Sequence, residues 1–289
     1  MIERSYTGAR PAIRLPRGAI DTQTHMFLPG YPAIEPGPPL PEGLPGPAEY
    51  RRLMDWLGID RVVVTQGNAH QRDNKNLIAC LAEMGPVARG VAVIDATTSQ
   101  VELDRLHAAG IRGARIMDLP GGAVGLEALE AVDVRAAAMG WVTAVQFDGN
   151  RILEHEARLA ALQSRFIIDH HGKFFAGAAP DSPEIDAVRR LIDTGNCWFK
   201  FAGCYESSRS GEPAYEDIAA TARALAAHAP DRIVWGTNWP HNLAKTTADY
   251  PNDAALTDTV LGWFPDEDGR RLALVDTPQA LFGFPPLAP

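Results

Sequence analysis

Short apolar runs alternate with amphipathic segments along the chain, and this alternation constrains the fold more than any other feature. The runs are rich in β-favouring residues and stay hydrophobic over consecutive positions, which is typical of parallel strands buried on both faces. We expect eight strands of this kind. They are Ala19–His25, Arg61–Gly67, Arg89–Asp95, Gly113–Met117, Trp141–Phe147, Phe166–His170, Cys197–Gly203 and Arg232–Asn238.

Seven segments with helical periodicity separate these runs. They are Ala48–Leu57, Asn74–Met84, Gln100–Ala109, Leu126–Met139, Ile152–Gln163, Glu184–Thr194 and Glu216–His228. Strands and helices in strict alternation predict an α/β fold, the (β/α)8 TIM barrel, with an open doubly wound sheet as the alternative. The 289 residues suit a single barrel domain, for which about 250 residues is usual.

The ends of the chain and one long connection depart from the alternation. Residues 1–17 are expected to form an N-terminal extension, and residues 251–289 a helical C-terminal tail packed over the outside of the barrel. The connection Met26–Pro47 is rich in Pro and Gly and follows the first strand. A loop at that place lies at the mouth of a barrel, so we expect a lid or wall there, or else an inert crossover.

Composition narrows the choice of partners. The net charge is -9 and no run of Lys or Arg stands out, so nucleic acid and anionic membrane surfaces are poor candidates. Neither a signal peptide nor a membrane span is expected. The three cysteines show no paired spacing, which favours a reducing, cytoplasmic compartment. Homo-oligomerisation stays open. The cysteines are Cys80, Cys197 and Cys204.

Polar side chains gather at the carboxyl ends of the predicted strands, where a TIM barrel holds its active site. A lone histidine at a strand end is usually structural, but several histidines that converge on one mouth indicate chemistry. The ring includes Gln23, His25, Gln66, Asn68, His70, Arg72, Asp95, Arg115, Asp118, Gln146, Asp148, Asp169, His170, His171, Lys173, Lys200, Tyr205, Glu206, Arg209, Asn238 and His241.

Three strand-end motifs resemble those of the amidohydrolase-2 group, which includes 2-pyrone-4,6-dicarboxylate lactonase. The motifs are Asp21-Thr22-Gln23-Thr24-His25, Asp169-His170-His171-Gly172 and Trp235-Gly236-Thr237-Asn238-Trp239-Pro240-His241. The resemblance covers essentially the whole chain and implies an amidohydrolase-like barrel. Two longer stretches, residues 66–73 and 198–203, look closer to a lactone isomerase of this group that interconverts the six- and five-membered lactones of galactaric acid.

The resemblance also shows where this chain departs from the hydrolases. In the related lactonases an Asp stands at the place of Asn238 and serves as metal ligand or as the base that activates water. An amide has no anionic charge and takes up no proton near neutral pH. This replacement argues against water as the nucleophile and favours a rearrangement within one molecule.

The expected metal site is depleted in the same way. The superfamily pattern uses a His-x-His pair, two further histidines and an Asp, whereas this chain has Gln23, Gln146 and Asn238 at three of those places. Only His25 and His170 match, and two imidazoles with three amides are a weak set for Zn²⁺. We therefore expect no metal and no cofactor. The rival interpretation recruits Asp118, Asp148 or Asp169 as unexpected ligands.

The resemblance implies a sugar diacid lactone as small-molecule substrate, with a carboxylate and several hydroxyls to bind. Its carboxylate calls for a guanidinium or an ammonium, for which Arg115, Lys200 and Arg209 are candidates. Amides suit its hydroxyls, although the same amides would also satisfy loop backbone. The amides are Gln23, Gln66, Asn68, Gln146 and Asn238. The further residues expected to contact substrate are His70, His171, Tyr205 and His241.

The predicted reaction is conversion of D-galactaro-1,5-lactone to D-galactaro-1,4-lactone in hexuronate catabolism. His170 and His25 are expected to act as the base and acid pair, with His171 and His241 in reserve. Lys200 or Arg115 would hold the tetrahedral oxyanion, and Asn238 would complete the catalytic set. Two alternatives stay open: a lactonase that hydrolyses a sugar-acid or pyrone dicarboxylate lactone, and a non-catalytic sugar-acid binding protein.

Overall fold

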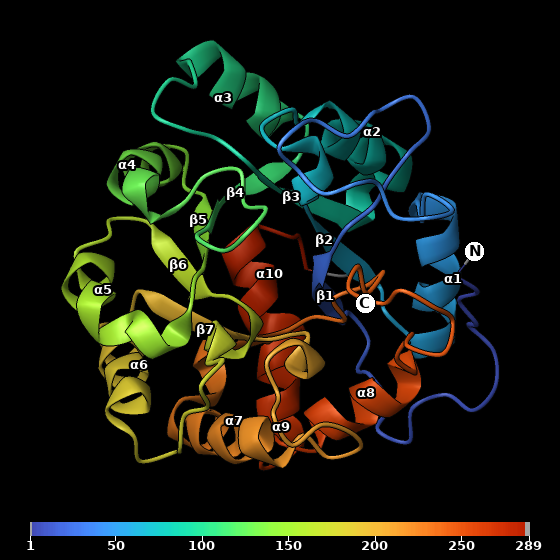
Figure 1. The fold of residues 1–289 in the computed structure, drawn as a ribbon, viewed down its shortest axis with the longest axis vertical. Helices are drawn as coiled ribbons and strands as arrows, with labels where there is room; N and C mark the ends of the chain where they lie inside the picture. The colour runs from blue at the N-terminus through green and yellow to red at the C-terminus, as the bar shows by residue number, and fades with distance from the viewer. Residues whose placement is uncertain (1, 287–289) are drawn as a thin grey trace.

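The computed structural model describes residues 2–286, and these residues form one parallel sheet whose strands follow each other in the order β1 to β8. Figure 1 looks into the barrel that this sheet encloses. Each strand coincides with a predicted apolar run and ends one to three residues before it, except β4, where both end at Met117. The strands are Ile20–Thr24, Arg61–Thr65, Ala88–Ala92, Ile111–Met117, Val142–Gln146, Arg165–Ile168, Cys197–Phe201 and Ile233–Trp235.

The barrel closes where the first strand meets the segment after the last. Thr24 forms a parallel bridge with Trp239. The backbone N–H of His25 donates to the Trp239 carbonyl at 2.9 Å, and that of Asn238 donates to the Gln23 carbonyl at 2.9 Å. This closure excludes the open doubly wound sheet, and it places the motifs after β1 and β8 side by side.

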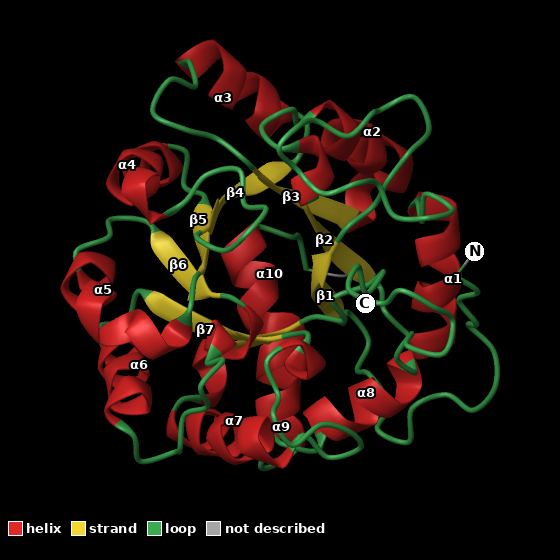
Figure 2. Ribbon diagram, in the orientation of Figure 1, coloured by secondary structure: helices red, strands yellow, loops and turns green. Residues whose placement is uncertain are grey.

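Helices surround the sheet in the ring that Figure 2 shows, one after each of the first seven strands. None of the helices within residues 2–286 is both long and apolar enough to cross a membrane. The seven helices α1 to α7 are Pro47–Leu57, Lys75–Met84, Gln100–Ala108, Leu129–Ala138, Ile152–Ala160, Pro183–Asp193 and Glu216–His228. The helices α8 to α10 of the tail are Asp253–Leu261, Glu267–Arg271 and Thr277–Phe282.

The tail does more than cover the outside of the barrel, and the expectation was wrong on this point. Leu281, Phe282 and Phe284 pack against the apolar residues that fill the barrel interior, among them Ile20 and Val63. Figure 1 shows α10 behind the barrel opening. The last turn of the tail therefore closes the amino-terminal end of the barrel. The carboxyl ends of the strands are left as the open face. Residues 287–289 of the predicted tail lie outside the described residues.

Arginines at the starts of two strands form hydrogen bonds with this last part of the tail. Arg61 donates to the side-chain oxygen of Gln279 and to the Pro285 carbonyl, both at 3.0 Å. Arg165 donates to the Ala280 carbonyl at 3.2 Å. The carbonyls at the end of a helix have no partner within the helix, so these guanidinium groups supply donors that the fold would otherwise lack.

The Pro-rich connection forms a wall beside the mouth. Its Ile34 N–H donates to the Ala69 carbonyl at 2.8 Å, and the His70 ring donates through Nε2 to the Tyr31 carbonyl at 3.1 Å. The N–H of Leu28 donates to the Asn76 side chain at 2.9 Å. These bonds tie residues 26–47 to the segment that follows β2, in agreement with the position expected for a lid or wall.

Candidate active site

A lysine lies at the centre of the polar end of the barrel. Lys200 on β7 is fully buried, and its Nζ is 2.9 Å from the side-chain oxygen of Gln23 and 2.7 Å from Oδ1 of Asp169. The contact with Asp169 is an ion pair whose direction does not suit a hydrogen bond, so neither Asp169 oxygen has a hydrogen-bond partner among the described residues. A buried charge pair of this kind fixes both side chains, because separating them would leave an uncompensated charge.

The same lysine orients the first histidine. The Lys200 ammonium donates a hydrogen bond to the oxygen of the Gln23 amide. The amide nitrogen of Gln23 therefore faces His25 Nε2, at 3.3 Å. His25 Nδ1 lies 2.9 Å from the Thr65 carbonyl, which can only accept. The Nδ1 atom therefore carries the proton, and the lone pair of His25 is on Nε2.

Arg115 supplies the second cation of the mouth. Its guanidinium donates to the Gln66 carbonyl at 2.8 Å, to the Asn68 side chain at 2.9 Å and to the Gln146 side chain at 3.1 Å. It also donates to Met117 Sδ at 3.3 Å, so all four acceptors are neutral, while Nε has no hydrogen-bond partner. The guanidinium is thus held in place without a carboxylate in contact, and its positive charge can attract an anion.

The second histidine belongs to a cluster built by the ends of β6, β7 and β8. His170 Nδ1 lies 3.8 Å from Oε2 of Glu206, and the same oxygen is in contact with the Lys173 ammonium. The other oxygen of Glu206 accepts from the Asn238 amide at 2.8 Å. Lys173 is buried, and its ammonium compensates the charge of Glu206. Glu206 at the same time accepts a hydrogen bond from the amide nitrogen of Asn238.

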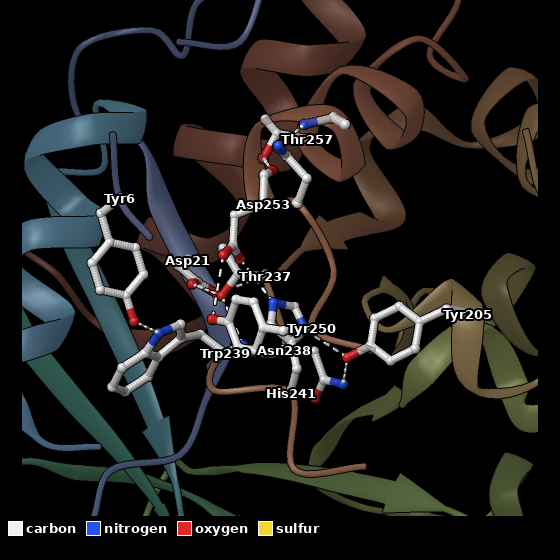
Figure 3. A network of polar contacts seen from close by, with 12 residues as sticks. Tyr6, Asp21, Tyr205, Thr237, Asn238, Trp239, His241, Tyr250, Asp253 and Thr257 are labelled. Atoms are coloured by element: carbon white, nitrogen blue, oxygen red, sulfur yellow. Dashed lines mark hydrogen bonds and ion pairs between the residues drawn. The ribbon is translucent and has the colours of Figure 1, made fainter. Parts of the chain in front are cut away.

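Asn238 donates a second hydrogen bond into a chain that Figure 3 shows. Its Nδ2 lies 2.8 Å from the Tyr205 hydroxyl, and that hydroxyl is 2.6 Å from His241 Nδ1. His241 Nε2 in turn is 2.8 Å from Oδ1 of Asp253 at the start of α8. Both amide hydrogens of Asn238 and both ring nitrogens of His241 are therefore engaged by protein groups.

The backbone after β8 reaches this arrangement through unusual conformations. Asn238 and His241 have φ values of 63° and 57°, in the left-handed region that costs most residues energy and that Asn tolerates better than others. Asp21 anchors the turn, because its carboxylate accepts from the Thr237 N–H at 3.0 Å and from the Thr237 hydroxyl. Burial raises the pKa of Asp21 to about 6, against the hydrogen bonds that lower it.

Gly203 permits the close approach of the two strand-end motifs. A Cβ atom on this residue would lie 2.7 Å from Asn238 Nδ2 and 3.1 Å from His170 Nδ1, and its φ is +60°. Any side chain would therefore push Asn238 and His170 from their positions, which makes glycine a requirement of the site.

Burial among cations keeps both candidate histidines neutral. Desolvation, with Arg115 and Lys200 nearby, lowers the pKa of His25 to about 3. Desolvation and the charges of Lys173 and Lys200 hold the pKa of His170 well below its ordinary value. A neutral imidazole accepts a proton, but it has no acidic proton to return near pH 7. The predicted pair of His25 and His170 therefore needs a different acid.

The residues at the family's metal positions do not fit a metal. Within residues 2–286 no group of three or more His, Cys, Asp or Glu side chains is arranged to hold an ion. Gln23 already has its oxygen on the Lys200 ammonium, and Asn238 presents its nitrogen and not its oxygen to its neighbours. A dication would also meet the fixed charge of Lys200 at short range.

Several predicted substrate contacts lie elsewhere or are already occupied. His171 stacks on Phe201 behind β7, with ring centroids 4.9 Å apart, and Arg209 is an exposed residue that donates to the Ala176 carbonyl. The Gln66 amide donates to two loop carbonyls, and the His70 ring donates to the loop after β1. These four side chains make contacts within the protein, and their part in substrate binding stays a prediction. The prediction for His241 changes, because it has no free ring nitrogen.

Sequence reasoning missed one member of the cluster and undervalued two. Asp253 lies in the tail, 12 residues after His241, and nothing in its neighbourhood marked it as functional. Glu206 and Lys173 were in the strand-end ring, but only the structure shows that they hold Asn238 and flank His170. An Asp that opens a helix after a polar strand end was the single available signal.

Comparison with known proteins agrees with this architecture. The chain belongs to the amidohydrolase family, whose model matches residues 20–284. It is 61% identical over 285 residues to a D-galactarolactone isomerase of Agrobacterium fabrum, covering 98% of this chain and 97% of the relative. It is 31% identical over 293 residues to a 2-pyrone-4,6-dicarboxylate hydrolase of Comamonas testosteroni, covering 95% and 93%.

A solved structure shows the same fold in detail. The apo crystal structure of an Agrobacterium tumefaciens protein superimposes with a TM-score of 0.96 at 61% sequence identity, covering 98% of this chain and 100% of the other. The barrel and its tail are therefore shared with a close relative, and the resemblance seen in the strand-end motifs is confirmed.

The buried histidines predict a loss of stability in acid. His25 and His171 have pKa values of about 3 in the fold against an ordinary 6.5, and that of His170 is also lowered. The unfolded chain therefore binds more protons than the folded chain between about pH 6.5 and pH 3. The free energy of unfolding consequently decreases as the pH is lowered through that window. Each histidine contributes up to about 1.4 kcal/mol per pH unit, measurable by urea unfolding from pH 7 to 4.5.

A substitution isolates one of these contributions. His171→Phe keeps the aromatic stack and removes one titrating group, so its stability should depend less steeply on pH by about 1.4 kcal/mol per unit below pH 6. Phe199→Leu, which alters the same aromatic cluster and removes no titrating group, is the matched control and should keep the wild-type slope. An unchanged slope in His171→Phe would contradict the assignment of a buried neutral imidazole.

Proposed function

We propose that this chain is a lactone isomerase that converts D-galactaro-1,5-lactone to D-galactaro-1,4-lactone without hydrolysis. The observation that carries the proposal is the state of Asn238. Both hydrogens of its amide are donated, to Tyr205 and Glu206, at the place where the lactonases have a carboxylate. An amide held in this way takes no proton from water, which favours a nucleophile that comes from the substrate itself.

The substrate carries such a nucleophile. Its 4-hydroxyl attacks the C1 carbonyl of the six-membered lactone, and collapse of the tetrahedral intermediate expels the ring oxygen O5. One proton leaves O4 and one reaches O5, so the sum of the reaction involves neither water nor a cofactor. Holding the two oxygens and the carbonyl in one geometry supplies most of the advantage over solution, because the reacting groups are already in one molecule.

The mouth offers matching partners for the rest of the substrate. Arg115, whose acceptors are all neutral, is the candidate for the carboxylate or for the developing oxyanion. Asn68 lies beside it on a partly exposed turn, and His25 Nε2 faces the Gln23 amide nitrogen at 3.3 Å. Lys200 is fully buried and bound to Asp169 and Gln23, so we assign it to the electrostatics of the site and not to direct contact.

The proposal extends to the setting of the enzyme. The donor set argues for catalysis without a metal, and the substrate belongs to the catabolism of galacturonate. The three cysteines are buried and unpaired, which suits the cytoplasm. The identity to a D-galactarolactone isomerase over nearly the whole length supports the choice of substrate over the pyrone dicarboxylate of the more distant hydrolase.

Product identity tests the proposal. Catalytic amounts of chelator-treated protein are mixed with fresh D-galactaro-1,5-lactone, and the reaction is followed by NMR. We expect the 1,4-lactone to form above the spontaneous rate before free diacid appears. Free diacid as the first product would identify a lactonase. Binding without turnover would identify a sugar-acid binding protein, and a requirement for Zn²⁺ or Mn²⁺ would overturn the account of the donor set.

Restoring a base should restore hydrolysis. Asn238→Asp alone places two carboxylates 2.8 Å apart, where Glu206 now accepts from the amide, so the new group would share a proton. Asn238→Asp combined with Glu206→Gln moves the carboxylate from position 206 to position 238 and keeps the net charge of the cluster. We expect this double variant to release free diacid at least about tenfold faster than wild type, as suits a general base.

Glu206→Gln alone is the matched control. It removes a carboxylate without placing one at position 238, so NMR should detect no additional diacid. Diacid release by this control at the rate of the double variant would contradict the role given to position 238.

A further inference from the structure

Three side chains at the mouth form a line of hydroxyl, imidazole and carboxylate. The Tyr205 hydroxyl lies 2.6 Å from His241 Nδ1, and His241 Nε2 lies 2.8 Å from Oδ1 of Asp253 (Figure 3). His241 and Asp253 are both almost fully buried. Two hydrogen bonds on opposite sides of one imidazole align the three groups, which is the connectivity by which a histidine withdraws a proton from a hydroxyl.

The carboxylate decides where the imidazole proton lies. Asp253 is in the first turn of α8, where its Oδ1 lies 2.8 Å from His241 Nε2 and its Oδ2 accepts from the Tyr250 hydroxyl at 3.4 Å. An ionised carboxylate only accepts, so His241 carries its proton on Nε2 and presents the Nδ1 lone pair to Tyr205. The Tyr205 hydroxyl then donates to His241 and accepts from the Asn238 amide at 2.8 Å.

Tyr205 is consequently the end of the line that faces substrate. His241 has no nitrogen left for a ligand, and Asp253 lies behind it. Tyr205 is partly exposed, and its oxygen sits beside Asn238, whose amide lies close to His170 across Gly203. Burial and the nearby Glu206 raise the pKa of Tyr205 well above its ordinary value, so the phenol keeps its proton unless His241 takes it.

We propose that Tyr205, coupled through His241 to Asp253, is the proton shuttle of the isomerisation. Tyr205 is the catalytic residue, and His241 and Asp253 act through it as positioning residues. The proposal rests on the isomerase function proposed above. It supplies the acid that the neutral histidines His25 and His170 lack.

The steps balance within one turnover. As O4 attacks C1, its proton moves to the Tyr205 oxygen while the proton of Tyr205 moves to His241 Nδ1, and Asp253 stabilises the resulting imidazolium. The C1–O5 bond then breaks, O5 takes a proton from Tyr205, and His241 returns its own. O4 and O5 are on neighbouring carbons of the substrate, so one shuttle serves both, and the enzyme ends in its starting state.

Asn238 has a specific part in this arrangement. Its N–H donates to the Tyr205 oxygen, so it partly offsets the negative charge that the oxygen develops when the phenol proton moves to His241. A carboxylate at position 238 would instead accept the proton of Tyr205 and compete with His241. The amide that excludes hydrolysis is therefore also the group that directs the Tyr205 proton into the relay.

Kinetics of three variants test the relay. Tyr205→Phe keeps the ring and removes the hydroxyl, and Asp253→Asn keeps the shape and removes the charge. We expect kcat for isomerisation to fall about 100- to 10,000-fold in Tyr205→Phe and about 10- to 100-fold in Asp253→Asn, with KM within about threefold of wild type. The double variant should be no slower than Tyr205→Phe, because residues that act as one unit are not additive.

Controls separate this proposal from folding and from the proposed function. Tyr215→Phe removes another buried phenol hydroxyl, one that bonds to Glu212, and should leave kcat within about threefold. Thermal unfolding of each variant shows whether the barrel is intact. Wild type without isomerase activity would refute the proposed function. An active wild type with a folded Tyr205→Phe of equal kcat, or additive losses in the double variant, would refute the relay alone.

Discussion

The ammonium of Lys200 is the fixed charge around which the mouth of this barrel is organised. It is fully buried on β7 and is compensated by Asp169, with the Gln23 amide as its hydrogen-bond acceptor. Through Gln23 it sets the direction of His25. Burial, together with the charges of Lys200, Arg115 and Lys173, lowers the pKa of His25 and His170 and keeps them neutral. A permanent cation at this depth also makes the site unsuited to a metal dication.

The second constraint is the direction of one amide. Glu206, balanced by Lys173, and Tyr205 both engage the nitrogen of Asn238, and this leaves no base at position 238. The same amide donates a hydrogen bond to the Tyr205 oxygen. The Tyr205 proton passes to His241, and Asp253 stabilises the resulting imidazolium. In physical terms, a lactonase and an isomerase on this fold differ in whether the group at the end of β8 accepts a proton or is an amide that only forms hydrogen bonds.

The sequence predicted the barrel well because its signal is periodic and long. Every apolar run became a strand. Each of seven predicted residues is at the mouth because it lies in the second half of a strand or within three residues after it, namely Gln23, His25, Arg115, Gln146, His170, Lys200 and Asn238. The tail was placed less well, because the apolar side chains of Leu281 and Phe282 do not reveal which surface they cover. His171 stacks on Phe201 although it is adjacent to His170, because neighbouring side chains at a strand end point in different directions.

Other features depended on geometry that no pattern encodes. The relay joins Tyr205 from the connection after β7, His241 from the connection after β8 and Asp253 from the start of α8, and it includes left-handed turns at Asn238 and His241. Likewise, residue type alone could not show that the Gln66 amide and the His70 ring donate to loop backbone carbonyls. Nor could it show that Arg115 has only neutral hydrogen-bond partners. The identity of a polar residue was readable from the sequence, whereas its partners were not.

Isotope incorporation tests the central claim most directly, namely that the acyl group moves within the substrate and water never attacks it. The enzyme would convert D-galactaro-1,5-lactone in H₂¹⁸O, and early 1,4-lactone would be analysed by mass spectrometry. Intramolecular transfer predicts a product without ¹⁸O at C1. Appearance of ¹⁸O in the lactone at the rate of turnover would mean hydrolysis followed by ring closure, and would contradict the account.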